Sequence, residues 1–417
     1  MDQDPARQHL RSRPGSRLQP LRPATTAQTT AALGFRFSWS DPRVRSVVWQ
    51  VVILGAVASA LVLIARNTAA NLEARRIATG FDFLRRTAGF PIAEHMIDYD
   101  PGLSSYGRAL TIGVLNTLKV SLTGVVAATL LGTLIAIARL WKAWLVARLA
   151  AAYVEVVRNV PLLLQLLFWY ALLQALPPPR QAWMPFPGFF LSNRGLRTPA
   201  LEWTNALNWC GLASCLGACA VLLLLRFAKR RQDLTGSRPT QWRLAFGLIA
   251  LPPVVVWVWL GERLIVDWPV LKGFNFTGGA LLSPECAALT LGLVVYTSAY
   301  IAEIVRSGIS AIAPSQWEAA TALGLRWEQA LRLIVLPQAV RVVVPPLTSQ
   351  YLHLVKNSSL AVAIGYPEVV SIASTTMNQT GQAIEAIGYV MLVYLSISLS
   401  ISLLMNWYEA RITPVLR

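Results

Sequence analysis

The sequence has few charged residues, few histidines and few cysteines for its length. Only 14% of its 417 residues are charged, 55% are hydrophobic, and the mean hydropathy is +0.50. An average soluble domain carries roughly 25% charged residues, so this composition excludes an ordinary soluble fold and indicates a membrane protein with several spans. The three histidines are scattered and lie in no zinc motif. We therefore expect no metal site and no catalytic site.

The four cysteines do not suggest a disulfide framework. Cys210, Cys215 and Cys219 lie in or beside one apolar segment, and Cys286 begins another. Cys215 and Cys219 would share a helical face, which makes a metal pair conceivable, but no nearby histidine or carboxylate completes it. We therefore interpret the cysteines as packing residues.

The net charge of +17 is concentrated in the loops and in the first 46 residues. Basic loops are expected on the cytoplasmic side of a membrane protein, whereas nucleic-acid binding needs a basic face on a folded module. Residues 1–46 are rich in Arg, Pro, Gln and Thr and lack the apolar core of a signal peptide. We predict a disordered cytoplasmic tail that contacts membrane lipid, and no nucleic-acid partner.

Eight apolar segments are each close to the ~20 residues that a helix needs to cross a bilayer. We predict an all-α fold with about eight transmembrane helices, the fifth bent by Pro252-Pro253 and the seventh broken by Pro345-Pro346. The segments are residues 47–65, 110–137, 156–176, 206–227, 244–261, 285–305, 342–364 and 386–406.

Lys and Arg residues predict the orientation of these spans. Basic turns follow the second, fourth and sixth spans, while the intervening loops are more balanced or apolar. The positive-inside rule therefore places both termini in the cytoplasm. Residues 177–204 and 262–284 are then external, and we expect interfacial loops and short re-entrant pieces there that could help dock an external protein.

The cytoplasmic loop after the sixth span carries a pattern, EAATALGLRWEQALRLIVLP. Its small, helix-favouring residues allow a partner to approach closely, and Gly324 can adopt the positive φ that ends a helix. Trp327, Leu331 and Ile334 then form an apolar stripe, and we expect Pro337 to end the second helix. The characteristic positions are Glu318, Ala319, Ala320, Gly324, Ile334, Leu336 and Pro337.

The spacing EAA-x3-G-x9-I-x-L-P resembles the cytoplasmic coupling loop of bacterial ABC importer permeases. Three further blocks resemble the polar-amino-acid branch of that family, in particular the Q-type membrane subunit of general L-amino-acid permeases. They comprise SYGRALTIGVLNTLKVSLTG with YVEVVRNVPLLLQLLFWY, then residues 289–325, then residues 335–370.

The resemblance implies an ABC type I importer permease fold. Residues 47–105 would be a first span and an external loop, and residues 106–410 the permease domain. A helix pair near 206–261 would be inserted in this domain, and the coupling loop would lie near 311–337.

The resemblance also implies a set of partners in the bacterial inner membrane. A periplasmic binding protein would deliver an L-amino acid to this multi-pass subunit and a second, related but different permease subunit. This chain has no G-x-x-x-x-G-K-[ST] phosphate loop, so it is not expected to be the ATPase. The resemblance implies separate ABC ATPase subunits that bind ATP and Mg. The chain itself would be a transport subunit rather than an enzyme, with no cofactor of its own.

Two other functions remain open from the residues alone. A secondary amino-acid transporter would need an inverted repeat and a coupling-ion site at a broken helix, and would have no docking loop. A membrane enzyme would need a nucleophile and a base, and the sequence suggests no such set.

Polar residues in the spans are candidates for a substrate pathway. Ser349, His353 and Lys356 follow one another at spacings of four and three, so they share a helical face, and Lys356 could meet a substrate carboxylate. Alternatively, Lys356 extends to the membrane surface or pairs with a neighbouring subunit. The further candidates are Asn357 and Ser358 on the same span, and Tyr296, Thr297 and Tyr300 on the sixth.

Two acid–base pairs at helix ends have a simpler interpretation. Glu155 and Arg158, and likewise Glu303 and Arg306, stand three residues apart. Such spacing favours an ion pair on the helix surface. We expect both pairs to be structural.

Overall fold

The computed structural model describes residues 42–74, 79–201, 204–235, 242–261 and 265–412, so most of the predicted tail lies outside the described residues. The chain forms two units, Met1–Arg75 and Arg76–Arg417. In the described part of the first unit there is one helix, α1 (Pro42–Ala74), whose apolar residues are exposed along its length. The boundary differs from the predicted grouping of residues 47–105, because residues 79–105 belong to the second unit.

Residues 79–105 pack against the helices of the second unit instead of forming a plain loop. They include the 3-10 helix η1 (Asp82–Arg85), whose Phe83 is completely buried. Phe83 lies in one hydrophobic cluster with residues of α2 (Tyr106–Arg139) and α11 (Val369–Thr380). On α2, the Asn116 amide donates hydrogen bonds to the carbonyls of Glu94 and Pro367, at 2.8 and 2.9 Å.

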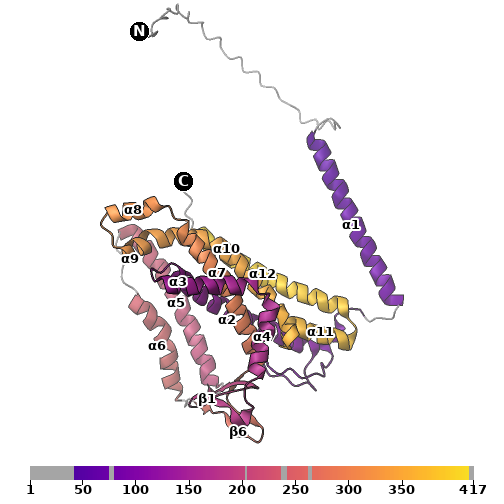
Figure 1. The fold of residues 1–417 in the computed structure, drawn as a ribbon. Helices are drawn as coiled ribbons and strands as arrows, with labels where there is room; N and C mark the ends of the chain where they lie inside the picture. Colours follow the sequence, from indigo (N-terminus) through magenta and orange to yellow (C-terminus); the bar gives the residue numbers. More distant parts are fainter. Residues whose placement is uncertain (1–41, 75–78, 202–203, 236–241, 262–264, 413–417) are drawn as a thin grey trace, which may run out of the picture. The chain divides into compact units, whose positions relative to one another are not determined.

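Helices α2 and α7 (Pro284–Ser310) form the centre of the second unit (Figure 1). They approach closely at Gly132, where an added Cβ would lie only 2.8 Å from the side chain of Ile301. Buried residues of α7, including Leu289 and Leu293, continue this core. The surrounding helical elements are α3 (Trp144–Asn159), α4 (Leu162–Gln174), α10 (Leu336–Asn357), the 3-10 helix η4 (Ser358–Ile364), α11 and α12 (Ala383–Ile412).

Helices α5 (Asn205–Thr235) and α6 (Trp242–Leu260) lie in the region where an inserted helix pair is predicted, and they pack on each other. A Cβ at Gly217 would lie 2.1 Å from the carbonyl oxygen of Leu248, so glycine permits this close crossing. Cys215 and Cys219 are exposed on α5, which contradicts their interpretation as packing residues, whereas Cys286 is buried as expected. No group of three metal-ligating side chains occurs among the described residues.

The fold is mostly helical rather than all-α, because the two loops predicted to be irregular form strands. Four antiparallel strands join in the order β1-β2-β3-β8, and two strand pairs accompany them. We call residues 177–201 and 265–283 the β-lobe. Its elements are η2 (Pro179–Gln181), β1 (Trp183–Phe186), β2 (Phe189–Ser192), β3 (Gly195–Thr198), β4 (Ala200–Leu201), β5 (Val266–Asp267), β6 (Val270–Lys272), β7 (Asn275–Thr277) and β8 (Ala280–Leu282).

Two short turns explain why the first half of the β-lobe folds into hairpins. Pro187 and Gly188 connect β1 to β2, and Asn193 and Arg194 connect β2 to β3. Gly188 has φ +82°, a backbone conformation that glycine adopts readily. Two-residue connections of this kind are typical of β-hairpins, so the first half of the β-lobe has a local sequence signal for its strands.

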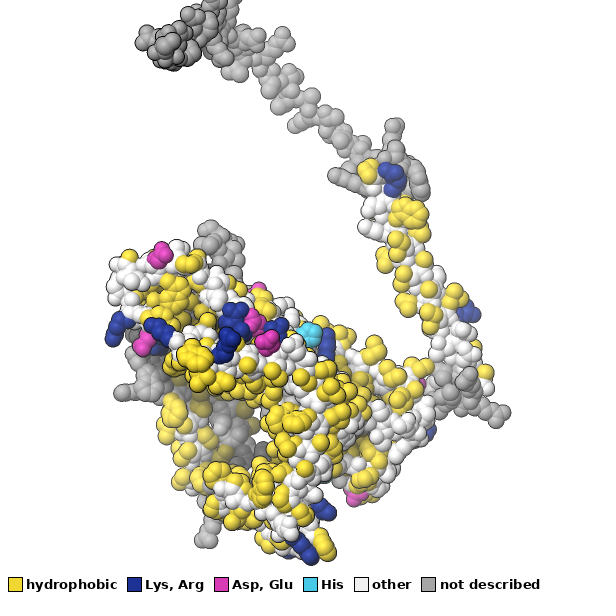
Figure 2. Space-filling view, viewed as in Figure 1, with side chains coloured by type: hydrophobic (Ala, Val, Ile, Leu, Met, Phe, Trp, Pro, Cys, Tyr) yellow, Lys and Arg dark blue, Asp and Glu magenta, His cyan; other side chains and the backbone are white. Residues whose placement is uncertain are grey.

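Among the described residues, six helices are long and apolar enough to cross a membrane, or seven if one bent pair counts as a single span. The difference from the predicted eight has two causes. The segment at 156–176 lies across α3 and α4, which meet at 104° where Pro161 interrupts the helix. The apolar part of α6, Leu244–Leu260, is shorter than the other spans. Figure 2 shows the wide band of hydrophobic side chains that these helices expose.

The proline pairs do not break the helices that contain them. Pro252 and Pro253 lie inside α6, and Pro345 and Pro346 lie inside α10. The prediction of a broken seventh span is therefore wrong at that position. The chain departs from α geometry at the two ends of α10 instead, in a π-helical segment, Leu331–Val335, and in η4.

Candidate functional site

The loop with the EAA pattern forms two short helices, as predicted. α8 (Pro314–Ala322) ends before Gly324, which has φ +73° and an N–H that donates to the carbonyl of Thr321. The next N–H, that of Leu325, donates to the carbonyl of Ala320 at 3.1 Å. These bonds satisfy carbonyls at the helix end, as in common glycine-terminated helices. α9 (Trp327–Ala330) then begins, and the Arg326 N–H donates to the Gln329 side chain.

The two helices pack through small and aromatic residues. Ala320 and Ala330 are buried, and the rings of Trp317 and Trp327 stack with centroids 6.2 Å apart and an interplanar angle of 16°. Leu323, at the turn, is 77% exposed. The hairpin formed by α8 and α9, residues 314–330, therefore holds its own shape while presenting an apolar tip; we call it the coupling hairpin.

Pro337 does not end the second helix, contrary to the prediction. α9 continues through the π-helical segment into α10, and Pro337 lies in the first turn of α10. In a regular α-helix the proline ring would clash with the carbonyl four residues earlier. The wider π turn, in which the Leu336 N–H donates to the carbonyl of Leu331, lies directly before the proline and accommodates it.

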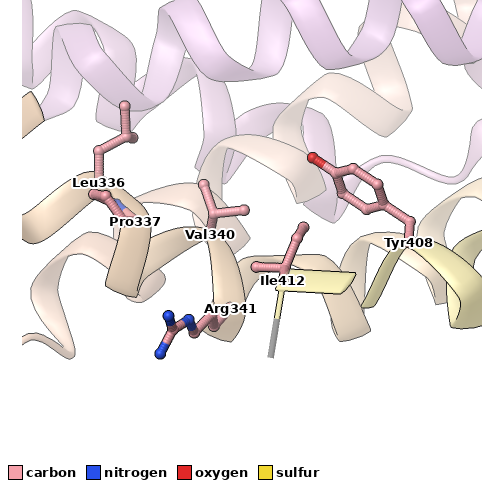
Figure 3. Close-up of a pocket in the computed structure, with 6 residues that line it drawn as sticks. All are labelled: Leu336, Pro337, Val340, Arg341, Tyr408 and Ile412. Atoms are coloured by element: carbon pink, nitrogen blue, oxygen red, sulfur yellow. The ribbon is translucent and has the colours of Figure 1, made fainter. Parts of the chain in front are cut away.

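An apolar groove of about 320 Å³ lies beside the first turns of α10. It is formed with the last turns of α12, and Figure 3 shows the Arg341 guanidinium pointing away from Tyr408 and Ile412, the lining residues of α12. Tyr408 is the aromatic residue of its lining. Together the coupling hairpin and this groove occupy one end of the second unit, opposite the β-lobe (Figure 1).

A polar cavity of about 420 Å³ lies where the ends of α2 and α3 meet α7. On its wall, Glu303 pairs with Arg139 of α2 and with Arg306, so the predicted Glu303–Arg306 pair is confirmed. Glu155 and Arg158 also line the cavity, but no ion pair joins them in the described structure. The Arg158 guanidinium lies over the ring of Tyr300, 5.0 Å from its centroid, which corrects the expectation of a second structural pair.

The structure brings together only some of the candidate pathway residues. Ser349, His353 and Lys356 are exposed on one face of α10, as the spacing predicted. Tyr296 and Tyr300 are half-buried, and their hydroxyls are 3.1 Å apart. The remaining candidates differ in burial: Asn357 is half-buried, Thr297 is 3% exposed, and Ser358 is completely buried with its hydroxyl bonded to the carbonyl of Val355.

Two buried glutamates were not identified from the sequence. Glu94 is paired with Lys119 of α2 and accepts a hydrogen bond from Ser283. Glu368 begins α11, where its carboxylate accepts the N–H groups of Val370 and Ser371 at 2.9 and 2.8 Å. Burial raises the pKa of Glu368 to about 7. Both residues lie in connecting segments, where the sequence pattern carries no burial signal.

Comparison with known proteins places this arrangement in a family. Residues 128–417 match the family described as binding-protein-dependent transport system inner membrane component. The chain belongs to this family. It is therefore a multi-pass permease component of the inner membrane, and the predicted transport subunit and ABC importer permease fold are confirmed. A binding protein and an ATPase are the partners that membership implies.

Relatives of this permease cover almost its whole length. It is 50% identical over 383 residues, 91% of this chain and 97% of the relative, to the putative amino-acid ABC transporter permease protein YhdX of Escherichia coli (strain K12). It is 44% identical over 396 residues, 94% and 98% of the two chains, to the general L-amino acid transport system permease protein AapQ of Rhizobium johnstonii. The resemblance to the polar-amino-acid branch is thereby confirmed.

Solved structures include a more distant match. The permease resembles a chain in the crystal structure of an amino acid ABC transporter with histidines, with 20% sequence identity and a TM-score of 0.44. The match covers 73% of this permease and 95% of the other chain.

Proposed function

We propose that this permease imports L-amino acids with energy from ATP hydrolysis on a partner subunit. The observation that carries the proposal is the coupling hairpin, a preformed two-helix element with an exposed apolar tip. The names of the two relatives support the substrate class, since both are permeases for amino acids. Transport then needs no covalent chemistry on this chain.

Reconstituted uptake tests this function. We expect proteoliposomes that contain the permease with its membrane partner and ATPase to accumulate a labelled L-amino acid only when ATP and the binding protein are present. Uptake driven by a sodium or proton gradient without ATP would instead support the secondary transporter.

The coupling hairpin is proposed to dock into the ATPase. Glu318 and Ala319 are exposed on α8, next to the buried Ala320, so α8 offers a partner both a charged group and a small side chain. Leu323 at the tip supplies the apolar contact. Because α9 continues into α10 without a break, a displacement of the hairpin by the ATPase would be transmitted along α10. This linkage is the proposed route from ATP hydrolysis to alternating access.

The exposed face of α10 is the proposed substrate pathway. Among the described residues, the side chains of Ser349, His353 and Lys356 have no hydrogen-bond or ion-pair partner, although they lie on an apolar helix. An ammonium group facing lipid is costly, so this face is better covered by a water-filled path or by a second subunit. A related but different permease subunit is the proposed occupant of the other side of the path.

The proposed membrane topology has eight crossings with both termini in the cytoplasm. The pairing of β4 with β5 brings the start of α5 and the end of α6 to the same sheet. The chain therefore enters α5 and leaves α6 on the same side of the membrane. If α5 crosses the membrane, α6 must cross back. With the bent pair α3–α4 as one crossing, the total is even, as the basic loops require.

Cysteine labelling tests this topology. We expect Met184→Cys in the β-lobe to react with a membrane-impermeant maleimide in intact cells. Leu323→Cys in the coupling hairpin should react only after permeabilisation. Both positions are exposed, at 60% and 77%, so a lack of reaction reports membrane sidedness. The reverse pattern would invert the whole orientation.

A further inference from the structure

A cavity of about 390 Å³ lies between the β-lobe and the helices of the second unit. Its volume is in the range of roughly 300–1,000 Å³ that is usual for small-molecule sites. The β-lobe contributes the turn between β2 and β3 and part of β7, and the helices contribute the end of α4 and the start of α7. In the proposed topology this cavity is on the external side, where a binding protein releases substrate.

Charged groups of both signs line this cavity. Arg194 and Arg197 come from the β-lobe, and Glu285 comes from the first turn of α7. Among the described residues, the Arg197 guanidinium donates one hydrogen bond, to the carbonyl of Gly278 at 3.0 Å, so most of its five N–H donors have no partner there. One carboxylate oxygen of Glu285 accepts the Tyr170 hydroxyl at 3.2 Å. Among the described residues, no cation neutralises Glu285.

Two amide side chains also line the cavity. The side-chain oxygen of Asn193 is buried and has no hydrogen-bond partner in the described structure. Such an acceptor is costly unless a donor reaches it. Asn275 adds a second amide to the lining, and its side-chain oxygen already accepts the N–H of Phe276 at 3.0 Å.

The floor of the cavity is fixed by a buried polar cluster. Ser283 lines the cavity and donates its hydroxyl to Glu94, which in turn pairs with Lys119 of α2. The site is therefore attached to the central helix and is not confined to a surface loop.

From this geometry we infer that the cavity is an external binding site for the free amino acid, occupied between its release by the binding protein and its entry into the membrane. The inference rests on the proposed function. The two arginines receive carboxylate or carboxamide groups, and Glu285 receives the α-ammonium. Two guanidinium groups with one carboxylate match an amino acid that has two carboxylates and one ammonium. The site therefore prefers glutamate and aspartate to lysine.

Direct binding tests the site in the purified complex of both permease subunits and the ATPase, without the binding protein. We expect labelled glutamate to bind the wild-type complex and unlabelled lysine to compete at least tenfold less well than unlabelled aspartate. Arg197→Met and Glu285→Gln should each weaken glutamate binding at least tenfold, and Arg197→Lys should weaken it less than Arg197→Met.

Arg180→Met is the matched control in the same lobe. Arg180 does not line the cavity and instead lies over the Phe274 ring, 3.9 Å from its centroid. We expect this variant to bind glutamate as the wild type does. An equal loss of glutamate binding in Arg180→Met, Arg197→Met and Glu285→Gln would indicate damage to the β-lobe and would overturn the site. Unchanged binding in Arg197→Met and Glu285→Gln would also overturn it.

ATP-driven uptake separates this inference from the proposed function. A wild-type complex that imports amino acids but shows no glutamate binding without the binding protein would overturn only the external site. A wild-type complex that imports no amino acid with all partners present would overturn the proposed function itself.

Discussion

Gly324→Val is expected to uncouple the permease from its ATPase. Gly324 has φ +73°, and this left-handed conformation costs an L-residue roughly 1–2 kcal/mol, more for a β-branched one. No atom lies within 4 Å of the position that a Cβ would occupy, so the effect would come from the backbone alone. We expect about a five- to thirtyfold loss of substrate-stimulated ATP hydrolysis, with less ATPase recovered on co-purification.

Gly324→Asn provides the control for this experiment. Asparagine adopts the left-handed conformation more readily than other L-residues, so the turn between α8 and α9 should persist. We expect the Asn variant to keep most of its ATPase coupling while the Val variant loses it. If both variants hydrolyse ATP and retain the ATPase like the wild type, the coupling hairpin is not the docking element.

The parts of the fold that the sequence predicted well are those determined by local pattern. Gly324 separates two helices because its conformation depends on the few residues around it. The apolar segments were located for the same reason, since a helix in a membrane satisfies its own backbone hydrogen bonds. Local pattern was less successful at prolines, because a pair such as Pro345-Pro346 can be accommodated inside a long helix.

The β-lobe illustrates what local pattern cannot predict. β3 pairs with β8 although about eighty residues, including two helices, separate them. The turns at Gly188 and Asn193 carry local hairpin signals that the prediction of loops and re-entrant pieces did not use. The partner of β3 has no local signal at all. The external cavity depends on this pairing, so Arg197 and Glu285 could not be recognised as neighbours of one site.

The candidate pathway shows a similar division. A helical repeat was sufficient to place Ser349, His353 and Lys356 on one face, and the structure leaves that face exposed. Burial of Thr297 and Ser358, in contrast, is determined by contacts between elements. Glu94 is buried by its pairing with Lys119 and Ser283, residues far away in the chain. Sequence periodicity contains no information about such contacts.

Lys356→Met is expected to reduce amino-acid uptake strongly while the permease still assembles with its ATPase. If Lys356 faces the pathway, its ammonium compensates the substrate carboxylate in a medium of low dielectric, where such contacts are stronger than in water. A hydrogen bond to a charged group contributes roughly 1.5–3 kcal/mol, so we expect uptake to fall about tenfold or more. Since Lys356 has no partner within the described part of this chain, its replacement should not destabilise the subunit itself.

Two further variants distinguish a pathway lysine from one that only extends to the membrane surface. Lys356→Arg keeps the charge but changes its geometry, so it should retain more uptake than Lys356→Met. Lys142→Met removes a lysine from the exposed turn between α2 and α3 and should transport like the wild type. ATPase co-purification verifies assembly of every variant, and labelled uptake in proteoliposomes measures transport. Normal uptake by Lys356→Met would assign the pathway to another face, with Tyr296 and Tyr300 of α7 as the next residues to test.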